Sequence, residues 1–335
     1  MTADNNDFVF SVKTDNWDHY ARFRPSYPES MWISWLNFHQ GPLESLMDVG
    51  TGGGVGAAGL LAVAAAIARS SSNSKQQIKH VYLSDPNQDN LAAAKKNFTA
   101  ENYPGIKFHF HCGPAEEAFP DVAPGSIDML IACASIHWTD IDTAMGTIAQ
   151  TLRSGGTFGA VVYPQPTIKD DEEAANALAQ VFEQRRRFQD VLDAEGDRTK
   201  SIRARAYRNL SVGLDYVPFD ASSWQTVHRR TANLPRDGKW PLRDSTWAHY
   251  GKPNIAVREG EEVELVEHDD WWSRKHYTVD QLKEFFQTLG YESFVMNGEL
   301  WETEAFKSFE KLIREEKRGS FELIWPAATV LGRKK

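Results

Sequence analysis

Short apolar runs alternate with helical stretches between Leu46 and Val162. Apolar runs that are bounded by turn residues are typical of buried strands. We predict strands at SLMDVG, HVYLSD, IKFHFHCG, SIDMLIACAS and GGTFGAVVYP. Helices are predicted over residues 57–68, 89–101 and 140–152. Strands that alternate with helices in this way form an α/β fold with a doubly wound, mostly parallel sheet.

The pattern changes after Tyr163, because Pro164 and Pro166 end the last of these strands. A charged amphipathic stretch at residues 172–192 follows, and then an Arg-rich segment that ends at Arg208. We interpret these two stretches as an inserted helical cap.

Other segments of the second half are assigned by local signals. WQTVHRR, residues 224–230, alternates polar and apolar positions as a strand of the main sheet would. Thr278 and Thr303 are candidate N-caps, the first of a helix that begins VDQLKEFF and the second of a helix that runs to Glu316. Residues 234–272 show no clear periodicity and are left unassigned.

The chain ends in FELIWPAATVLGRKK, which predicts a final strand. Proline has no N–H to donate to a strand ladder. We therefore expect a bulge or an edge position at Pro326.

A glycine-rich turn follows the first predicted strand and has the sequence Asp48-Val-Gly50-Thr-Gly52-Gly-Gly54. Glycines allow the backbone to turn sharply and to approach a ligand closely. Residues 52–57 match the G-x-G-x-x-A form of the dinucleotide fingerprint, so NAD is one candidate ligand. S-adenosylmethionine is the other, since it carries an adenosine without a pyrophosphate and ends in a cationic amino acid.

Three acidic positions favour S-adenosylmethionine. Asp48 lies at the end of the first strand, where a carboxylate suits a cationic ligand and repels a pyrophosphate. Asp85 ends the next strand and can accept hydrogen bonds from both ribose hydroxyls. Glu116 follows Ala115 after the third strand and is placed for the adenine edge.

Bulk composition narrows the class of protein. The 335 residues have a formal net charge of -9, which argues against nucleic-acid binding because such binding relies on Lys and Arg at the phosphates. No apolar run reaches the ~18 residues that cross a membrane. The N-terminus resembles no secretory signal, so we expect a cytosolic protein without a membrane partner.

Two motifs resemble those of a known family. CASIHWTD, residues 133–140, resembles the segment after the fourth strand in small-molecule methyltransferases of the trans-aconitate methyltransferase type, which commonly carry a His-Trp pair there. YARFRPSYP, residues 20–28, resembles the N-terminal segment Tyr-x-x-x-Arg-Pro-x-Tyr-Pro that folds over the cofactor in these enzymes. The resemblance, to fungal-type members in particular, covers most of the chain at varying strength. It implies a class I methyltransferase fold with a seven-stranded sheet and an inserted cap.

We accordingly divide the chain into four parts. Residues 1–40 form an N-terminal lid segment, and residues 41–163 form the S-adenosylmethionine-binding core. Residues 164–277 form a substrate cap that includes one core strand, at 224–230. Residues 278–335 supply the C-terminal helices and the final core strand.

Carried over by position, the resemblance implies a cofactor site. Asp85 would hold the ribose and Glu116 the adenine, while Tyr20 and Arg24 would close the site and take part in catalysis. Cys133 would help to line the path toward the acceptor. The full implied set is Tyr20, Arg24, Asp48, Gly50, Thr51, Gly52, Asp85, Pro86, Ala115, Glu116, Cys133 and Ala134.

The residues that bind the methyl acceptor are predicted from the chemistry of methyl transfer. The rate of this reaction depends mainly on the alignment of the two ligands and requires no catalytic dyad. A carboxylate acceptor would need cationic clamps, available from Arg22, Arg24, Arg203, Arg205, Arg229 and Arg274. A hydroxyl or amine acceptor would need a base, and His137 is the candidate, with structural packing as its alternative role. We predict that the acceptor pocket is lined by His137, Trp138, Trp271, Trp272 and Arg274.

Three classes of function remain open. The favoured one is S-adenosylmethionine-dependent O- or N-methylation of a small organic molecule, either a polycarboxylate or a secondary metabolite. A methyltransferase-fold regulatory protein that does not methylate small molecules is the second. An NAD-dependent oxidoreductase is the third, and only the bare glycine pattern supports it.

Overall fold

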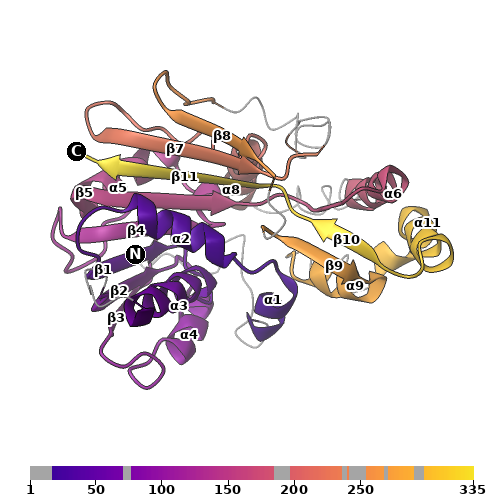
Figure 1. Ribbon diagram of the computed structural model, residues 1–335, viewed down its shortest axis with the longest axis horizontal. Helices are drawn as coiled ribbons and strands as arrows, with labels where there is room; N and C mark the ends of the chain where they lie inside the picture. The colour runs from indigo at the N-terminus through magenta and orange to yellow at the C-terminus, as the bar shows by residue number, and fades with distance from the viewer. Residues whose placement is uncertain are drawn as a thin grey trace.

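The computed structural model of this chain describes residues 17–70, 77–184, 197–235, 240, 254–267, 271–289 and 298–335. Its strands form a large sheet and a small one, each at the centre of a lobe (Figure 1). The strands of the large sheet are β1 (Ser45–Val49), β2 (His80–Ser84), β3 (Lys107–His111), β4 (Ile127–Cys133), β5 (Leu152–Val162), β7 (Trp224–Ala232), β8 (Glu262–Val266) and β11 (Ala327–Lys334). The strands of the small sheet are β6 (Thr167–Ile168), β9 (Ser273–Tyr277) and β10 (Phe321–Ile324).

Helices pack against both sheets. The helices of the N-terminal segment and the large lobe are α1 (Trp17–Phe23), α2 (Glu29–Phe38), α3 (Val55–Ser70), α4 (Gln88–Asn97), α5 (Ile141–Thr151) and α8 (Asp197–Leu210), with the short 3₁₀-helix η3 (Ile136–Trp138). Those of the small lobe are α6 (Glu172–Glu183), α9 (Val279–Gln287) and α11 (Glu304–Lys311), with the short turns η5 (Glu299–Glu302) and η6 (Leu312–Glu316).

The described residues order the large sheet as β3-β2-β1-β4-β5-β11-β7-β8. The five strands predicted in the first half are confirmed and pair in parallel. β11 then runs antiparallel between β5 and β7, and β8 pairs in parallel with β7. The sheet is mostly parallel, as predicted, but it has eight described strands instead of seven.

The additional strand, β8, lies in the region that we left unassigned. Its apolar residues Val263 and Leu265 are 58% and 69% exposed, so they add nothing to the core. Its acidic residues instead pair with β7, where Glu264 lies 2.7 Å from Arg230 and Glu262 lies 2.7 Å from His228. Its sequence, Glu-Val-Glu-Leu-Val, alternates polar and apolar residues as a strand does, and Val266 packs against the core, so the prediction missed a short strand signal here.

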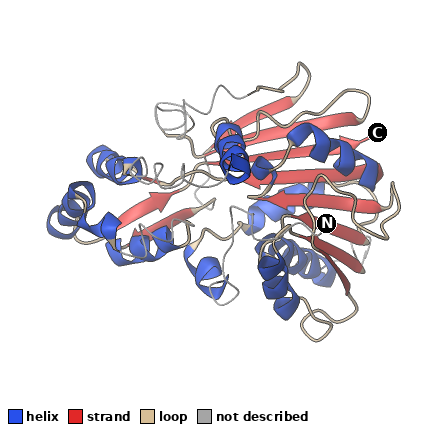
Figure 2. Cartoon of the chain, turned by 180° about the vertical axis from the view of Figure 1, so that it is seen from behind, coloured by secondary structure: helices blue, strands red, loops and turns tan. Residues whose placement is uncertain are grey.

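The faces of the central strands alternate as a parallel sheet requires. Leu46 and Ile131 belong to the hydrophobic cluster that includes α2 and α3. Met47 and Leu130, one residue along each strand, belong to the cluster that includes α5. Figures 1 and 2 show these helices on the two opposite faces.

Helix caps confirm the predicted helix starts. Thr278 forms a capping box with Gln281 at α9, and Thr303 accepts a hydrogen bond from the N–H of Phe306 at α11. Both helices pack in the small lobe, together with α6, which was predicted as part of the cap. Residues 185–196 of the predicted cap lie outside the described residues.

The predicted final strand is two strands. β10 is the middle strand of the small sheet, β11 lies in the large sheet, and Trp325 and Pro326 connect them. Pro326 therefore lies at the break between two ladders, where no N–H is required, and not at a bulge or an edge.

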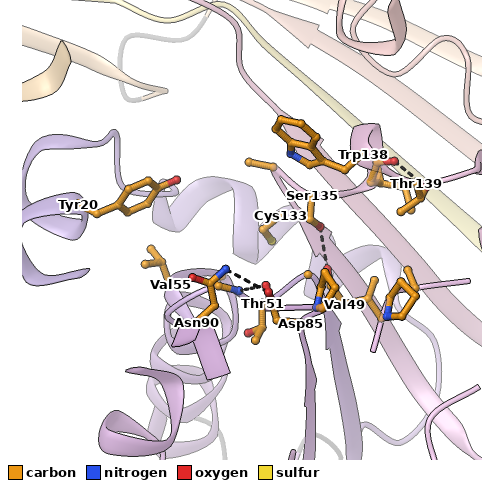
Figure 3. Close-up of a pocket in the computed structure, with 18 of the residues that line it drawn as sticks. Tyr20, Val49, Thr51, Val55, Asp85, Asn90, Cys133, Ser135, Trp138 and Thr139 are labelled. Carbon is orange, nitrogen blue, oxygen red and sulfur yellow. Dashed lines mark hydrogen bonds between the residues drawn. The ribbon is translucent and has the colours of Figure 1, made fainter. Parts of the chain in front are cut away.

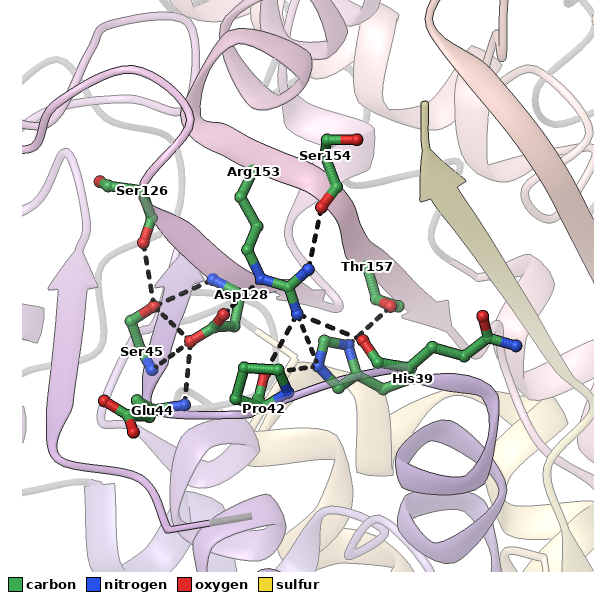
Figure 4. Close-up of polar contacts among 10 residues, drawn as sticks. His39, Pro42, Glu44, Ser45, Ser126, Asp128, Arg153, Ser154 and Thr157 are labelled. Atoms are coloured by element: carbon green, nitrogen blue, oxygen red, sulfur yellow. Dashed lines mark hydrogen bonds and ion pairs between the residues drawn. The ribbon is translucent and has the colours of Figure 1, made fainter. Parts of the chain in front are cut away.

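A polar network joins the amino ends of β1, β4 and β5 (Figure 4). The carboxylate of Asp128 accepts hydrogen bonds from the N–H groups of Glu44 and Ser45, at 2.9 and 2.8 Å, and from the Ser45 hydroxyl at 2.8 Å. Its other oxygen lies 2.5 Å from Nε of Arg153. Burial raises the pKa of Asp128, but the hydrogen bonds from Arg153, Ser45 and Glu44 outweigh it and hold the pKa below its usual value.

None of the helices in the described part of the chain is both long enough and apolar enough to cross a membrane.

Candidate cofactor and acceptor site

A cavity of about 430 Å³ lies at the carboxyl ends of β1, β2, β4 and β5 (Figure 3). This edge is where open α/β sheets bind their ligands. Residues of α1 and α8 complete its walls, although α8 comes from the second half of the chain. Of the predicted site residues, the cavity brings together Tyr20, Arg24, Gly50, Thr51, Gly52, Asp85, Pro86, Ala115, Glu116, Cys133, Ala134 and Trp138.

Two glycines of the turn are required by close neighbours. Gly50 has φ +65°, and a Cβ there would lie 2.5 Å from Cβ of Ser135. Gly52 has φ +55°, and its Cβ would lie 2.5 Å from the indole of Trp17. The turn is therefore enclosed by the β4 end on one side and by α1 on the other, and a larger side chain would displace these walls.

Four backbone N–H groups of the turn and of the start of α3 donate within the protein. A pyrophosphate is bound by N–H groups that point at it from the start of a helix. Here the N–H of Gly52 donates to Asp85 at 2.9 Å, and the N–H of Ala57 donates to Asp48 at 3.2 Å. The N–H groups of Thr51 and Gly54 donate to backbone carbonyls. This leaves fewer N–H groups for a pyrophosphate, and the carboxylates of Asp48 and Asp85 at the turn disfavour its negative charge.

Several buried oxygen atoms at the site, which can accept hydrogen bonds, have no donor among the described residues. Oδ1 of Asn90 and Oε2 of Glu116 are buried without a hydrogen-bond partner, and both side chains line the cavity. Oδ1 of Asp48, beneath the turn, is in the same state. A ligand rich in donors, such as ribose hydroxyls and an adenine amino group, would satisfy the oxygen atoms of Asn90 and Glu116. The residues present therefore fit S-adenosylmethionine.

Asp85 lies at the end of β2 and lines the cavity. Besides the Gly52 N–H, its carboxylate accepts hydrogen bonds from the N–H of Asn87 at 2.9 Å and from Nδ2 of Asn90 at 3.1 Å. Burial raises the pKa of Asp85, in spite of these hydrogen bonds. The same carboxylate therefore braces the glycine turn and faces the ligand.

Asp48 does not line the cavity, although we predicted that it would cradle the methionine end. It is 1% exposed and accepts hydrogen bonds from the Thr51 hydroxyl at 2.9 Å and from the N–H of Ala57. Burial raises its pKa to about 7. Its charge therefore acts on the site from below the turn, through the field and not by direct contact.

His137 is also absent from the cavity wall, so the structure does not support it as a base that faces the acceptor. Its ring is buried beside Trp138, with ring centroids 5.2 Å apart, which is the packing alternative. Burial lowers its pKa to about 3. A neutral imidazole with so low a pKa is a weak proton acceptor at neutral pH.

Trp271, Trp272 and Arg274 were predicted to wall the acceptor pocket, and none of them lines the cavity. Trp271 is 1% exposed and donates from Nε1 to the Ser30 hydroxyl at 2.7 Å. Arg274 donates to the carbonyl oxygen of Arg24 at 2.7 Å. Trp272 packs behind two tyrosines of the wall, with its ring centroid 6.0 Å from that of Tyr27 and 5.5 Å from that of Tyr163.

Of the six candidate arginines, the cavity wall includes Arg24 and Arg205. Arg24 lies beside Tyr20, with Cζ 5.0 Å from the ring centroid. Arg205 donates two hydrogen bonds to the carbonyl oxygen of Trp138, at 3.2 and 2.9 Å. Figure 3 places Tyr20 and Trp138 on different sides of the cavity, so the two guanidinium groups come from different walls.

The prediction missed several lining residues. Tyr163 follows the end of β5, and the rule that ligands lie at the carboxyl ends of parallel strands would have found it. Its hydroxyl is hydrogen-bonded to Tyr20 and Arg24, and burial raises its pKa. Ser201 and Ile202 lie on α8, whose sequence gives no signal of its approach to the site. The remaining missed residues include Trp17, Tyr27, Val55, Gly56, Asn90 and Ser135.

Within the described ranges, no three His, Cys, Asp or Glu side chains gather as metal ligands would.

This sheet, with its cavity at the carboxyl ends, has the fold of class I methyltransferases. Residues 47–160 match the family model described as a methyltransferase domain. A protein of Anaeromyxobacter dehalogenans assigned as a type II methyltransferase has a solved structure with TM-score 0.54. It is 16% identical, and the alignment covers 93% of this chain and 98% of that one, so it supports the fold.

Curated relatives are fungal methyltransferases. Methyltransferase AacuQ of Aspergillus aculeatus is 33% identical over 175 residues, which are 50% of each chain. Methyltransferase gedG of Aspergillus terreus is 26% identical over 334 residues, 96% of this chain and 92% of the relative. The chain thus aligns with about half the length of the first and with most of the second. Together with the domain match, they support an S-adenosylmethionine-dependent methyltransferase.

Proposed function

We propose that this protein transfers a methyl group from S-adenosylmethionine to a small organic acid. The cofactor assignment is supported by the hydrogen-bonding state of the polar atoms at the glycine turn. Four N–H groups there donate within the protein, whereas buried oxygen atoms of Asn90 and Glu116 have no hydrogen-bond donor among the described residues. When bound, S-adenosylmethionine supplies an electrophilic methyl group on a cationic sulfur.

The residues of the chain bind and orient the two ligands. Asp85 and Asn90 would hold the ribose, Glu116 would hold the adenine edge, and Asp48 would favour the cationic end from below the turn. Trp17 and Tyr20 close the cavity from α1 and exclude water. Alignment and exclusion of water account for much of the rate of methyl transfer.

An acid acceptor is supported by the two guanidinium groups in the wall. Arg24 and Arg205 place two positive charges in the wall, which favour an anionic acceptor, although each guanidinium group already donates to a backbone carbonyl oxygen, that of Thr288 or of Trp138. A carboxylate is already a nucleophile at neutral pH. Its methylation therefore needs no general base, and the burial of His137 does not prevent the reaction. A polycarboxylate of the trans-aconitate type and O-methylation are therefore our proposed acceptor and reaction. A cytosolic location stays a prediction.

Two measurements test the proposal. In calorimetry, S-adenosylmethionine should bind and NAD should not, and heat from NAD alone would overturn the cofactor assignment. Labelled methyl should then pass from S-adenosylmethionine to members of a panel of di- and tricarboxylates that includes trans-aconitate. Transfer only to matched phenols or amines would replace the acid with a secondary metabolite. Tight binding of cofactor without any transfer would favour a regulatory protein.

A further inference from the structure

Trp272 lies directly before β9 in a backbone conformation that large side chains seldom adopt. Its φ is +49°, in the left-handed region. The residue is 4% exposed, and its carbonyl oxygen accepts a hydrogen bond from the N–H of Trp325 at 3.0 Å. Strained conformations of this kind persist where the surroundings hold them, and they concentrate at functional sites.

The indole of Trp272 supports two tyrosines of the cavity wall from behind. Its ring centroid lies 6.0 Å from that of Tyr27, edge to face, and 5.5 Å from that of Tyr163. The two tyrosine rings also meet each other, at 6.4 Å. Both tyrosines line the cavity, and Trp272 does not. Any change in the volume of the indole therefore reaches the cavity through these two rings.

The same short segment also acts on Arg24. Two residues beyond Trp272, Arg274 donates a hydrogen bond to the Arg24 carbonyl oxygen at 2.7 Å. The Arg24 side chain is hydrogen-bonded to the Tyr163 hydroxyl and donates to the carbonyl oxygen of Thr288 at 2.9 Å. Tyr27, Tyr163 and Arg24 are thus all fixed by residues of the small lobe.

We propose that Trp272 is a positioning residue for the methyl acceptor, acting through Tyr27 and Tyr163. This inference rests on the proposed function, since it assigns the Arg24 end of the cavity to the acceptor. The glycine turn and Asp85, which belong to the cofactor end, make no hydrogen bond or ring contact with Trp272 in the described part of the chain. Tyr20 and Arg24, which the family resemblance placed in the cofactor set, are hydrogen-bonded to Tyr163, and we assign them to the acceptor end. A change at Trp272 should therefore separate the two ligands, whereas a residue that only filled the core would affect stability alone.

The first test follows the Tyr163 ring without any ligand. 3-Fluorotyrosine is placed at position 163, and ¹⁹F spectra are compared for the parent, Trp272→Leu and the milder Trp272→Phe. Trp224→Leu is the matched control, because Trp224 is similarly buried at 3% exposure but packs against Phe158 and Phe219. We expect the resonance to shift and broaden in both Trp272 variants and to stay unchanged in the control. An unchanged resonance in folded Trp272 variants would overturn the proposal.

The second test separates the ligands. In Trp272→Phe, the dissociation constant of S-adenosylmethionine, measured by calorimetry, should stay within about twofold of the parent, while KM for trans-aconitate rises about tenfold because small misplacements at a site are costly. Equal losses for both ligands would contradict a role limited to the acceptor. If the parent protein binds no S-adenosylmethionine or leaves trans-aconitate unmethylated, the proposed function fails, and the ¹⁹F spectra still decide whether Trp272 positions Tyr163.

Discussion

Buried carboxyl groups lie at both ends of the parallel strands, and their pKa values are shifted in opposite directions. At the amino ends, Asp128 receives hydrogen bonds from Ser45, Glu44 and Arg153, and its pKa is held low. At the carboxyl ends, Asp48 keeps one oxygen without a donor, and burial raises its pKa to about 7. The first arrangement stabilises the fold, whereas the second costs stability and places a buried carboxyl group beneath the turn that binds the ligand. Stability and binding are thus concentrated at opposite edges of one sheet.

Removal of the Asp128 carboxylate is expected to have the largest effect on the free energy of unfolding. Asp128→Ala leaves Nε of Arg153 and the N–H groups of Glu44 and Ser45 without their acceptor, and we expect the free energy of unfolding to fall by about 4 kcal/mol. Urea denaturation measures this. The dissociation constant of S-adenosylmethionine should change by less than about twofold, since the cavity is at the other edge.

Acid should have the same effect on the parent protein. A carboxylate with a lowered folded-state pKa contributes stability that is present above its unfolded pKa and is lost as pH falls through the folded pKa. The difference in unfolding free energy between the parent and Asp128→Ala should therefore shrink as pH falls below the usual aspartate range. A difference that is constant with pH would contradict the Asp128 assignment.

At the carboxyl ends, Asp85→Asn is expected to affect the ligand more than the fold. It keeps the shape of the side chain and removes its charge, so the dissociation constant of S-adenosylmethionine should rise about 30-fold, as hydrogen bonds to a charged group are worth ~2 kcal/mol. Calorimetry measures the change. Were Asp85→Asn to unfold the protein without weakening binding, the division between the two edges would not hold.

Asp48→Asn should have a smaller effect on stability, and its sign depends on pH. Because the folded-state pKa of Asp48 is raised, its contribution to stability is greatest below its unfolded pKa and is lost as pH rises toward about 7. Relative to the parent, Asp48→Asn should become more stable between pH 4 and pH 8, by on the order of 2 kcal/mol. Denaturation at both pH values provides the comparison, and a gain at pH 4 only would refute it.

The smallest effect is expected at His137. A residue that packs without taking a proton should tolerate His137→Gln with a loss in kcat of less than about tenfold, whereas removal of a general base costs ~10² or more. The pH–rate profile of the parent should show no inflection near the usual histidine pKa. A steep loss that is restored by raising the pH would return His137 to the mechanism.

Much of the large lobe could be predicted because its signals are local. The apolar runs of β1, β4 and β5 are buried on both faces, and the glycine turn and Asp85 lie at strand ends, where the parallel topology brings them together. Tyr20 and Arg24 were found through a motif and not through periodicity. Thr278 and Thr303 marked their helices because caps depend on a few adjacent residues.

Other features depend on contacts between distant segments, and the sequence does not specify these. Ser201 and Arg205 reach the cavity because α8 packs against η3. Asp48 looked like a ligand contact, but the turn folds over it and separates it from the cavity. Trp272 was predicted to line the acceptor pocket. It lies behind the wall of the cavity, because Tyr27 and Tyr163 line the cavity in front of it.

The passage of the chain through Trp325 and Pro326 has a consequence for how this protein can be divided or recombined. The small lobe is assembled from residues 167–183 and 273–324, and β11 then returns to lie between β5 and β7. No single cut separates the lobes, because removing everything after residue 272 also removes an inner strand of the large sheet. An exchange of the small lobe with that of a relative would have to replace two segments at once and leave residues 327–334 in place.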